Sequence, residues 1–270
     1  MRYVLVQGGL GNQMFQYAFM LALRHRGIDV QMDISYFNLM EMHNGYELKR
    51  VFGIGEPCID KSGLHLLSLR AIAKFPVKRM MIKDDYDVNM NVFDTQTKFY
   101  WGYWQNSRYF KDIERELRKA FQFVEIDDGN AAIAQKMANC NSVSVHIRRG
   151  DYAAFGMKII GDEYYSEALS YMKEKMPNAH YFVFSDDQNV ARNIVEKIGI
   201  DYELIDWNKG VDSYKDMYLM SQCKHNIIAN SSFSWWGAWL NGTSDKIIVA
   251  PKKWSDSIGP QPQEESWVLF

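Results

Sequence analysis

The 270-residue chain contains little cysteine and almost no net charge. Its three cysteines, Cys58, Cys140 and Cys223, are odd in number and far apart, which argues against both a disulfide framework and a cysteine zinc site. We expect three reduced, buried thiols. The 31 Lys and Arg residues are balanced by 33 Asp and Glu residues. The basic excess typical of nucleic-acid-binding proteins is therefore missing, and no nucleic-acid partner is expected.

A hydrophobic run long enough to cross a membrane is also missing. The most apolar early run, 14–23, contains Gln16 and is well short of the ~20 residues that a spanning helix needs. The glycines and amides of residues 7–13 interrupt the order of a signal peptide, so we expect a cytoplasmic protein. The stretch from Lys61 to Lys83 has basic residues and no acidic ones. It fits either peripheral contact with the inner face of the cytoplasmic membrane or a helical pair with a basic polar face.

The chain otherwise has the composition of a globular protein, with 47% hydrophobic and 24% charged residues. Short β-like runs alternate with helical patterns, which is typical of parallel β-α-β units. Strands are predicted at 3–7, 29–33, 99–104, 142–147, 180–184, 202–205, 226–229 and 246–250. One helix is predicted after the glycines of residues 8–11, a helical pair at 61–83, and further helices at 106–121, 163–175, 189–198, 213–223 and 233–240.

The weakest pattern lies around 127–141, which is the candidate domain boundary. We therefore predict two Rossmann-like α/β halves with parallel sheets that face a cleft, an N-terminal domain at 1–135 and a C-terminal domain at 136–270. Ligands of such sheets bind outside the carboxyl ends of the strands. Residues that directly follow a predicted strand are therefore the candidate site residues.

Two arginines directly follow the predicted strand that ends with His146 and Ile147. Paired guanidinium groups at a strand end offer forked donors that match phosphate oxygens, so Arg148 and Arg149 are candidate phosphate ligands. Asp151, after a glycine that permits a sharp turn, is placed to orient an arginine or accept a proton. The alternative is a loop of solvated charges, with His146 in the core.

Two more predicted strands end in polar residues. Asp186 and Asp187 follow one of them and suit ribose hydroxyls or a guanine edge, or else the N-cap of the next helix. Residues 231–234 follow the other, and their hydroxyls and free N–H groups at a helix start suit an anion. We expect Trp235 and Trp236 in the core. Because these strands belong to one predicted sheet, the three strand ends together predict a nucleotide-diphosphate cleft.

The glycine-rich segment 8–14 begins like the dinucleotide fingerprint G-x-G-x-x-G, and Asp33 lies about twenty residues further on. This pattern favours a nicotinamide or flavin oxidoreductase, but Met14 replaces the third glycine. The alternative is that Asn12 and Gln13 direct their amides into a cleft.

Asp85 and Asp87 form an Asp-x-Asp triplet that is able to hold a divalent metal against a nucleoside diphosphate. The alternative is an ordinary acidic loop, because such triplets occur often by chance. The chain has no Walker loop and no histidine pair at metal-ligand spacing.

Several segments together resemble the alpha-1,2-fucosyltransferase family, glycosyltransferase family 11, of the bacterial type. They are GGLGNQMFQY at 8–17, HIRRGDY at 146–152 and SSFSWWGAW at 231–239, and FYWGYWQ at 99–105 resembles the family's aromatic segment. The resemblance covers nearly the whole chain, except for about 58–91.

The resemblance implies a GT-B-type fold, no metal or other cofactor, GDP-L-fucose as donor and the O2 of a terminal galactose as acceptor. That acceptor belongs to a cell-surface glycan such as an O-antigen, which can be lipid-linked. The resemblance places the donor in the C-terminal domain and the acceptor in the N-terminal domain. It implies Arg148, Asp151 and Asn12 as catalytic residues. Donor contacts are expected from His146, Arg148, Arg149, Asp186, Asp187, Ser231, Ser232, Phe233, Ser234, Gly11 and Gln13.

The implied reaction is an inverting transfer, in which Arg148 stabilises the negative charge that grows on the departing GDP. Some relatives have a glutamate base shortly after the arginine motif, where this chain has Ala153, Ala154 and Phe155. Either Asp151 or the departing phosphate then accepts the proton. The alternatives from other classes are a metal-dependent transferase of another nucleotide sugar and a non-catalytic carbohydrate-binding protein.

Overall fold

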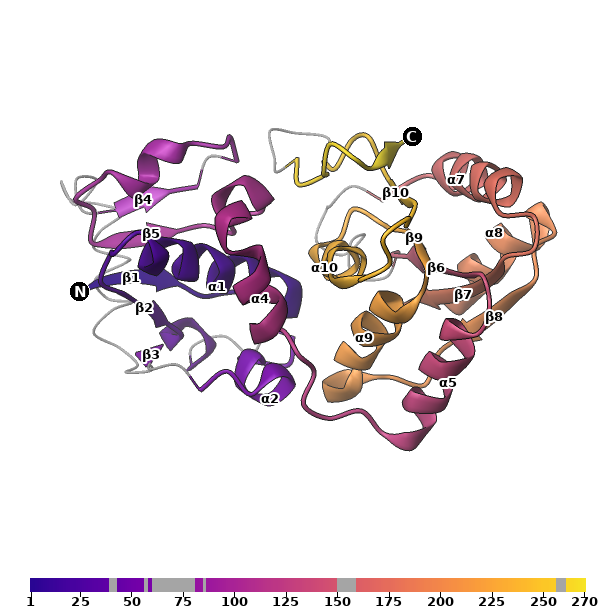
Figure 1. Cartoon of the computed structure of the whole chain (residues 1–270), viewed down its shortest axis with the longest axis horizontal. Helices are drawn as coiled ribbons and strands as arrows, with labels where there is room; N and C mark the ends of the chain where they lie inside the picture. Colours follow the sequence, from indigo (N-terminus) through magenta and orange to yellow (C-terminus); the bar gives the residue numbers. More distant parts are fainter. Residues whose placement is uncertain (39–42, 56–57, 60–80, 85, 150–158, 256–260) are drawn as a thin grey trace. The chain divides into compact units, whose positions relative to one another are not determined.

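The computed structural model describes residues 1–38, 43–55, 58–59, 81–84, 86–149, 159–255 and 261–270 (Figure 1). The chain divides into two compact units, each with its own parallel sheet. Unit 1 comprises Met1–Val124 and Gly259–Pro262, and unit 2 comprises Glu125–Ile258 and Gln263–Phe270. Two α/β units with parallel sheets are thus confirmed.

The predicted boundary between residues 135 and 136 falls inside a helix of unit 2, α5 (Asp128–Ala138). The units instead separate after Val124. The side chain of Asp127 caps the first turn of α5. Ala134 and Met137 are its buried apolar residues, so its apolar face is small. That small face explains why the sequence pattern is weak here.

The sheet of unit 1 has five parallel strands in the order β3-β2-β1-β5-β4 (Figure 1). The strands are β1 (Arg2–Leu5), β2 (Val30–Asp33), β3 (Cys58–Ile59), β4 (Met81–Lys83) and β5 (Phe99–Trp101). The helical segments are α1 (Leu10–His25), η1 (Ser35–Asn38), α2 (Leu48–Phe52), η3 (Met90–Phe93), η4 (Ser107–Tyr109), η5 (Lys111–Ile113) and α4 (Glu114–Ala120).

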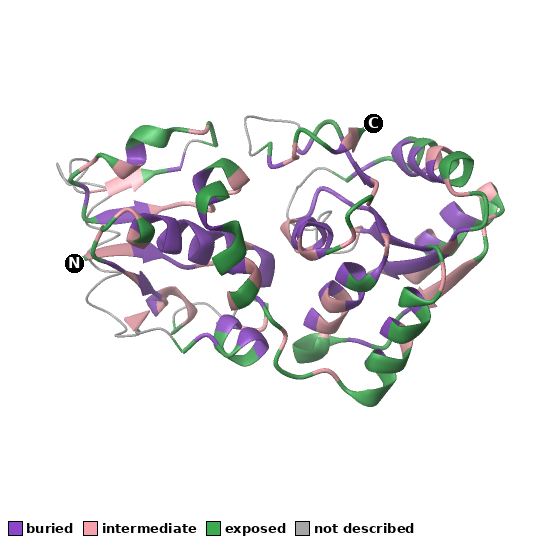
Figure 2. Ribbon diagram, in the orientation of Figure 1, coloured by how far each residue is buried: buried purple, intermediate pink, exposed green. Residues whose placement is uncertain are grey.

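Helix α1 forms the centre of the core of unit 1. Figure 2 shows it buried along most of its length, and its thirteen consecutive or near-consecutive buried residues run from Leu10 to Leu23. Phe19 stacks on Trp104, with ring centroids 4.1 Å apart. The apolar run at 14–23 is therefore explained by burial in this core. None of the helices in the described ranges has both the length and the hydrophobicity that crossing a bilayer requires.

Three sequence predictions in unit 1 need correction. Residues 81–83, predicted as the end of a helical pair, form strand β4 and pair with β5, while 60–80 lie outside the described residues. The strand predicted at 99–104 ends at Trp101, because Gly102 and Trp104 have positive φ angles of 156° and 55°, which regular strands do not contain. The helix predicted at 106–121 is broken into η4, η5 and α4, because Phe110 departs from helical geometry, with φ −131° and ψ 15°.

The sheet of unit 2 has six parallel strands in the order β11-β10-β9-β6-β7-β8. They are β6 (Ser142–Ile147), β7 (His180–Ser185), β8 (Tyr202–Ile205), β9 (His225–Ile227), β10 (Ile248–Ala250) and β11 (Val268–Leu269). The helical segments besides α5 are α7 (Asp162–Lys175), α8 (Gln188–Ile198), η6 (Gly210–Asp212), α9 (Tyr214–Gln222) and α10 (Ser232–Leu240). The regular alternation predicted for this half is confirmed. Cys58, Cys140 and Cys223 form no disulfide, but only Cys223 is buried as expected, while Cys58 and Cys140 are half-buried.

Each face of this second sheet is covered by its own hydrophobic cluster. Val143 and Val145 of β6 pack in the cluster that contains α7 and α8. Phe182 and Phe184 of β7 pack in the cluster that contains α5 and α9. Trp235 and Trp236 are fully buried, as predicted for the core. With both faces covered, the strand ends are the part of the sheet that is left for a ligand.

Candidate functional site

The strand order of the unit 2 sheet reverses between β6 and β9. The chain runs from β6 outward to β7 and β8, then crosses back to β9 and runs outward to β10 and β11 on the other side. In open parallel sheets, ligands bind outside the carboxyl ends of the strands at such a switch point. The residues that follow β6 and β9 are therefore the candidate site of unit 2.

Arg148 is the first residue after β6, and it lies beside Asp186, the first residue after β7. The ladder between these strands ends with Ile147 opposite Ser185, so the next residue on each strand lies alongside the other. Arg148 Nε is 3.1 Å from Asp186 Oδ2, and Asp186 Oδ1 accepts a hydrogen bond from the backbone nitrogen of Arg149 at 2.8 Å. Asp186 therefore orients the first arginine, a role that the sequence offered to Asp151.

The second arginine is held by a residue that no motif indicated. Arg149 forms an ion pair with Asp162, the first residue of α7, and only 17% of the arginine side chain is exposed. Asp187 accepts from the backbone nitrogen of Val190 at 3.1 Å and caps α8. Of the two roles predicted for the acidic pair, Asp187 has that of the helix cap. Asp186 contacts the arginines, which the sequence did not indicate, and the nucleotide contacts of both residues stay predictions.

The segment after β9 begins α10 next to the end of β6. The Ser231 hydroxyl accepts from the backbone nitrogen of Phe233 at 3.3 Å and caps the helix. Ser232 and Phe233 are half-buried, so both remain candidates for contact with a ligand. Ser234 is fully buried, and its hydroxyl donates to the Ser231 carbonyl at 3.3 Å. The side chain of Ser234 therefore belongs to the core, and its donor contact stays a prediction.

His146, near the end of β6, is neutral and lies close to the start of α10. Burial, followed by the neighbouring charge of Arg148, lowers the pKa of His146 to about 3. Its ring centroid lies 6.1 Å from that of Phe233 at the start of α10. Within the described part of the chain, Nδ1 of this buried imidazole has no hydrogen-bond partner, which is uncommon for a buried polar atom. The site thus contains Nδ1 of a neutral imidazole beside the guanidinium groups of Arg148 and Arg149.

The chemistry of these strand ends suits an anion. The Arg148 side chain is 30% exposed and oriented, and it lies on the strand next to the one that leads into α10. Guanidinium donors and the N–H groups of a helix start both bind phosphate oxygens. A diphosphate therefore fits the switch point. Gly150 and Asp151 lie outside the described residues, so any contact of Asp151 remains a prediction.

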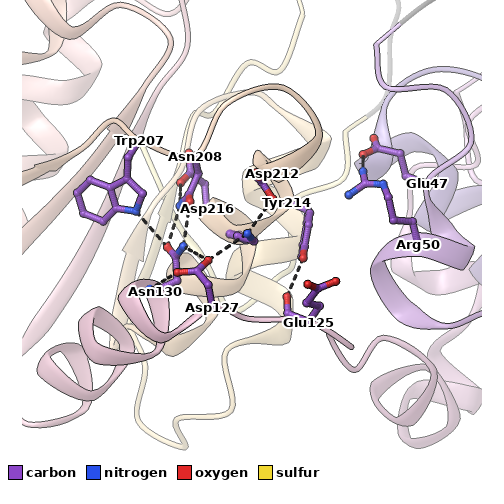
Figure 3. A network of polar contacts seen from close by, with 11 residues as sticks. Glu47, Arg50, Glu125, Asp127, Asn130, Trp207, Asn208, Asp212, Tyr214 and Asp216 are labelled. Atoms are coloured by element: carbon purple, nitrogen blue, oxygen red, sulfur yellow. Dashed lines mark hydrogen bonds and ion pairs between the residues drawn. The ribbon is translucent and has the colours of Figure 1, made fainter.

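A network of side-chain amides fixes the loop after β8, at the same edge of the sheet (Figure 3). Asn130 and Asn208 exchange hydrogen bonds of 3.0 and 2.9 Å, and Asn208 Nδ2 also donates to Asp216 Oδ1 at 2.8 Å. Trp207 Nε1 donates to Asn130 Oδ1 at 3.4 Å. The network joins the starts of α5 and α9 to this loop. Trp207 itself is 46% exposed.

Lys215 extends this network to Asp127, near the start of unit 2. Its Nζ lies 3.0 Å from Asp127 Oδ2 and 2.7 Å from Asp212 Oδ1. Hydrogen bonds from Asn130, and then from Lys215, hold the pKa of Asp127 well below its ordinary value. The N-terminal ends of α5 and α9 are thereby fastened together.

Asp216 should make the stability of the fold depend on pH. Burial raises its pKa to about 7 from an ordinary value of 3.8. Because the folded-state pKa is the higher one, the unfolded chain ionises first, and stability falls as pH rises from about 4 to about 7. Asp216→Asn keeps an oxygen for Asn208 and has no charge, so we expect it to remove this loss. Melting temperatures should diverge in favour of the variant as pH rises, whereas a constant difference would contradict the assignment.

In unit 1, the glycine-rich segment is held together by Gln13. Gly8, with a φ of 80°, turns the chain from β1 into α1. Gln13 Nε2 donates to the carbonyls of Gly8 and Gly45 at 2.9 and 2.8 Å, and its Oε1 accepts from Glu47 N at 2.8 Å. Gln13 and Gly11 are both buried, and the Gln13 amide protons are used within the loop. The donor contacts of these two residues stay predictions.

The N-terminus of α1 is already occupied by the carboxylate of Glu47. This side chain is buried and accepts hydrogen bonds from the backbone of Leu10, from Asn44 at 3.3 Å and from Arg50 at 2.5 Å. Burial raises the pKa of Glu47 in spite of these donors. In a dinucleotide fold this helix end binds the pyrophosphate. The Glu47 carboxyl group occupies this position, which removes the structural basis for a nicotinamide- or flavin-binding interpretation of the glycines.

Asn12 lies at the carboxyl edge of the unit 1 sheet. Its Oδ1 accepts from Gln105 Nε2 at 2.7 Å, which joins the first turn of α1 to the loop after β5. Gln16 makes a second link by donating to the carbonyl of Gly102 at 3.0 Å. Asn12 is half-buried, and its contact with the transferred sugar remains a prediction.

The metal interpretation of the acidic triplet is not tested, because Asp85 lies outside the described residues. Among the residues that the structure does describe, no group of three or more His, Cys, Asp and Glu is placed to hold a metal ion.

Comparison with known proteins gives one consistent family. The sequence model described as "Glycosyl transferase family 11" matches residues 65–267. An alpha-1,2-colitosyltransferase of Escherichia coli is 35% identical, over 97% of this chain and 96% of that protein. The O-antigen biosynthesis glycosyltransferase WbnK of Escherichia coli is 30% identical, over 93% and 94%. Human galactoside alpha-(1,2)-fucosyltransferase 1 is 23% identical, over 92% of this chain and 67% of the relative.

Solved structures give the same fold at low sequence identity. The fucosyltransferase NodZ from Bradyrhizobium has a TM-score of 0.53 and 16% identity, with 96% of each chain covered. A glycosyl transferase family 9 protein from Veillonella parvula has a TM-score of 0.50 and 13% identity, over 99% of this chain and 86% of that one. At these identities the likeness concerns the fold alone, and the predicted GT-B-like class is confirmed.

Proposed function

The chain belongs to glycosyltransferase family 11, and from this premise we propose that it is an inverting galactoside alpha-1,2-L-fucosyltransferase. The proposed reaction transfers fucose from GDP-L-fucose to the O2 of a galactose in a cell-surface glycan. The observation that supports it most is the cationic switch point of unit 2, where Arg148 is oriented by Asp186 beside the start of α10.

Arg148 has the central role in the proposed mechanism. Breaking the bond between the anomeric carbon and the phosphate oxygen moves negative charge onto the departing GDP. A guanidinium already oriented by Asp186 meets that charge without reorganising, and removing one such donor typically costs about 3 kcal/mol of transition-state stabilisation. Ser232 and Phe233, at the start of α10, complete the diphosphate site.

The fate of the proton follows from how far the bond has broken in the transition state. With an oxocarbenium-like transition state, the acceptor hydroxyl attacks a carbon that is already strongly electrophilic. A weak base is then enough, and we propose Asp151 for it, because a phosphate that departs from the opposite face of the sugar cannot accept this proton directly. Attack from the face opposite GDP inverts the anomeric centre. The proposed reaction uses no metal, because the positive charge is provided by side chains.

We assign the donor to unit 2 and the acceptor to unit 1. The name of the relative WbnK refers to O-antigen biosynthesis, which supports a bacterial surface glycan as the acceptor. A lipid-linked acceptor would also give the basic stretch 61–83 a purpose, as a peripheral contact with anionic lipid. Most of that stretch lies outside the described residues, so this part rests on the sequence.

GDP-colitose is the second candidate donor. It is favoured by the relative that is 35% identical over nearly the whole chain and is named a colitosyltransferase. Both candidates share the GDP group that the switch point is proposed to bind. The two proposals therefore predict the same role for Arg148 and differ only in the sugar.

A donor panel tests the proposal directly. The purified protein is incubated with lactose and with GDP-fucose, GDP-colitose, GDP-mannose, UDP-galactose or NAD, each with and without EDTA, and released nucleotide and product are measured. We expect GDP release from GDP-fucose that lactose increases and EDTA leaves unchanged. Activity with GDP-colitose alone would transfer the proposal to the second donor. Activity only with a UDP-sugar and metal would refute both.

A further inference from the structure

The side-chain amide of Asn12 is held at one of its two ends. Asn12 lies in the first turn of α1, where its backbone nitrogen donates to the Gly9 carbonyl at 2.9 Å. Its side-chain oxygen, Oδ1, accepts from Gln105 Nε2 at 2.7 Å, at the short end of the range for amide pairs. Backbone and side chain are both fixed, so the plane of the amide is set.

The other end of the Asn12 amide is available to a ligand. Within the described ranges, Nδ2 of Asn12 makes no hydrogen bond and is not enclosed by protein. It lies against Gly8, the residue that turns the chain out of β1, because a β-carbon added to this glycine would be 2.7 Å from Nδ2. Glycine leaves the room that the amide needs here. The two N–H groups of Nδ2 are therefore unused at the carboxyl edge of the sheet.

Gln105 belongs to a loop that is immobilised next to it. The preceding residue, Trp104, has a left-handed φ of 55° and donates from its backbone nitrogen to Asp84 Oδ2 at 2.8 Å. The Trp104 carbonyl accepts from the backbone nitrogen of Asn106 at 2.8 Å. Strained conformations of this kind persist where the surroundings fix them, and they cluster at functional sites. The loop thus presents Gln105 to Asn12 in a fixed position.

The Gln105 contact decides which end of the Asn12 amide a ligand meets. An amide group has an end that donates hydrogen bonds and an end that accepts them. Because Gln105 donates, a turned-over Asn12 amide would bring N–H groups against N–H groups with no acceptor between them. Gln105 therefore keeps the Asn12 oxygen on the protein side and the N–H groups on the ligand side.

This orientation restricts what Asn12 does in the reaction. An N–H group donates to a ligand oxygen, and it cannot accept a hydrogen bond from an attacking hydroxyl. In the proposed function, the oxygens that suit it are the hydroxyls of the transferred sugar and the phosphate oxygens next to that sugar. A hydrogen-bond donor directed at an oxygen whose negative charge grows in the transition state raises kcat more than it strengthens ground-state binding.

We propose that Gln105 is a positioning residue of the transfer reaction, which holds the Asn12 amide with its N–H groups toward an oxygen of the GDP-sugar. That the ligand is a GDP-sugar rests on the proposed function. The orientation of the amide rests on the contacts of Asn12 with Gln105 and Gly8.

A double-mutant cycle tests whether Gln105 acts through Asn12. We would measure kcat and KM, for the GDP-sugar that the donor panel selects, in Gln105→Met, Asn12→Ala and the double variant, with thermal melts as the check on folding. We expect Gln105→Met to lower kcat about tenfold, the size of one neutral hydrogen bond. It should have no further effect once Asn12 is replaced. Gln96→Met removes an exposed amide before β5 and should behave as wild type.

Gln105→Glu tests the direction of the amide. An ionised carboxylate has the length of glutamine but only accepts hydrogen bonds, so it favours the turned-over Asn12 amide with the oxygen on the ligand side. We expect kcat at neutral pH to fall at least as far as in Gln105→Met. As the pH falls, the protonated carboxyl donates again, and kcat relative to wild type should recover in this variant alone. A wild-type kcat at neutral pH would overturn the proposed direction.

The outcomes separate this inference from the proposed function. Equal losses from Gln105→Met with and without Asn12 would overturn it, because Gln105 would then act independently. A folded Gln105→Met variant with wild-type kcat would do the same.

If no GDP-sugar is a substrate, the proposed function fails, and NMR of the side-chain amides decides the inference. The Asn12 signals are identified by their loss in Asn12→Ala. A change of these signals in Gln105→Met but not in Gln96→Met would support the fixed amide, and unchanged signals would overturn it.

Discussion

Arg148→Ala should reduce kcat for transfer by about 100- to 1,000-fold, the effect of removing one preorganised donor to a developing oxyanion. Arg148 is 30% exposed and bonded to Asp186 at a strand end, not packed in the core. The variant should therefore fold, and its melting temperature should lie within a few degrees of wild type. Initial rates at saturating donor and acceptor, together with a thermal melt, provide the measurement.

Two further variants make this prediction specific. Arg192→Ala removes an exposed arginine from α8 in the same unit and should leave turnover unchanged. Arg148→Lys keeps the charge but loses the forked donor, so its rate should lie between those of wild type and Arg148→Ala. If a correctly folded Arg148→Ala turned over like wild type, the donor site would have to be sought elsewhere.

Gly102→Ala should be the most damaging small substitution in unit 1. The new β-carbon would lie 2.0 Å from Asp84 Cβ, and the φ of 156° is one that side-chain-bearing residues rarely adopt. Because the obstructing atom is next to the backbone, the loops after β4 and β5 have to separate. We expect a loss of about 3 kcal/mol of unfolding free energy, at the upper end for overpacking. Chemical denaturation, with the fluorescence of the nearby tryptophans as probe, measures it.

Gly27→Ala is the matched control for this loss. Gly27 also has a positive φ, 76°, but no atom lies within 4 Å of the position of an added β-carbon. The alanine variant should lose unfolding free energy only because alanine disfavours this backbone conformation, by about 1 kcal/mol. Equal losses in the two variants would mean that the contact between Gly102 and Asp84 contributes nothing.

The unit 2 site could largely be predicted from the sequence, because its residues directly follow strands. Short β-like runs between helical patterns located β6, β7 and β9, and the predicted parallel topology then brought Arg148, Asp186 and Ser232 to one edge. The division of roles between Asp186 and Asp187 could not be predicted. It depends on register, which places Ile147 opposite Ser185, and register is a property of two strands rather than of either sequence.

The features that were missed depend on contacts between distant segments. Asp162 holds Arg149 from the start of α7, and Glu47 reaches the start of α1 across 37 residues of chain, from residue 10 to residue 47. The buried side chain of Asp84 accepts hydrogen bonds from the backbone nitrogens of Tyr86 and Trp104. Because every sequence has backbone nitrogens, no residue pattern marks this contact. β3 and β11 are two residues long, too short for an alternating pattern.

Glu47 has a consequence for selectivity between the two sheets. Unit 1 begins α1 after β1, and unit 2 begins α10 after β9. Either helix start can attract a diphosphate through its free N–H groups. A carboxylate that belongs to the chain acts as a tethered competitive inhibitor of one of them, since its effective concentration is set by the fold and not by dilution. Under the proposed function, the donor is then expected at the start of α10 and not at that of α1, without any improvement in affinity at α10. A carboxyl group at the start of α1 thus gives a selectivity that would otherwise require tighter binding at the start of α10.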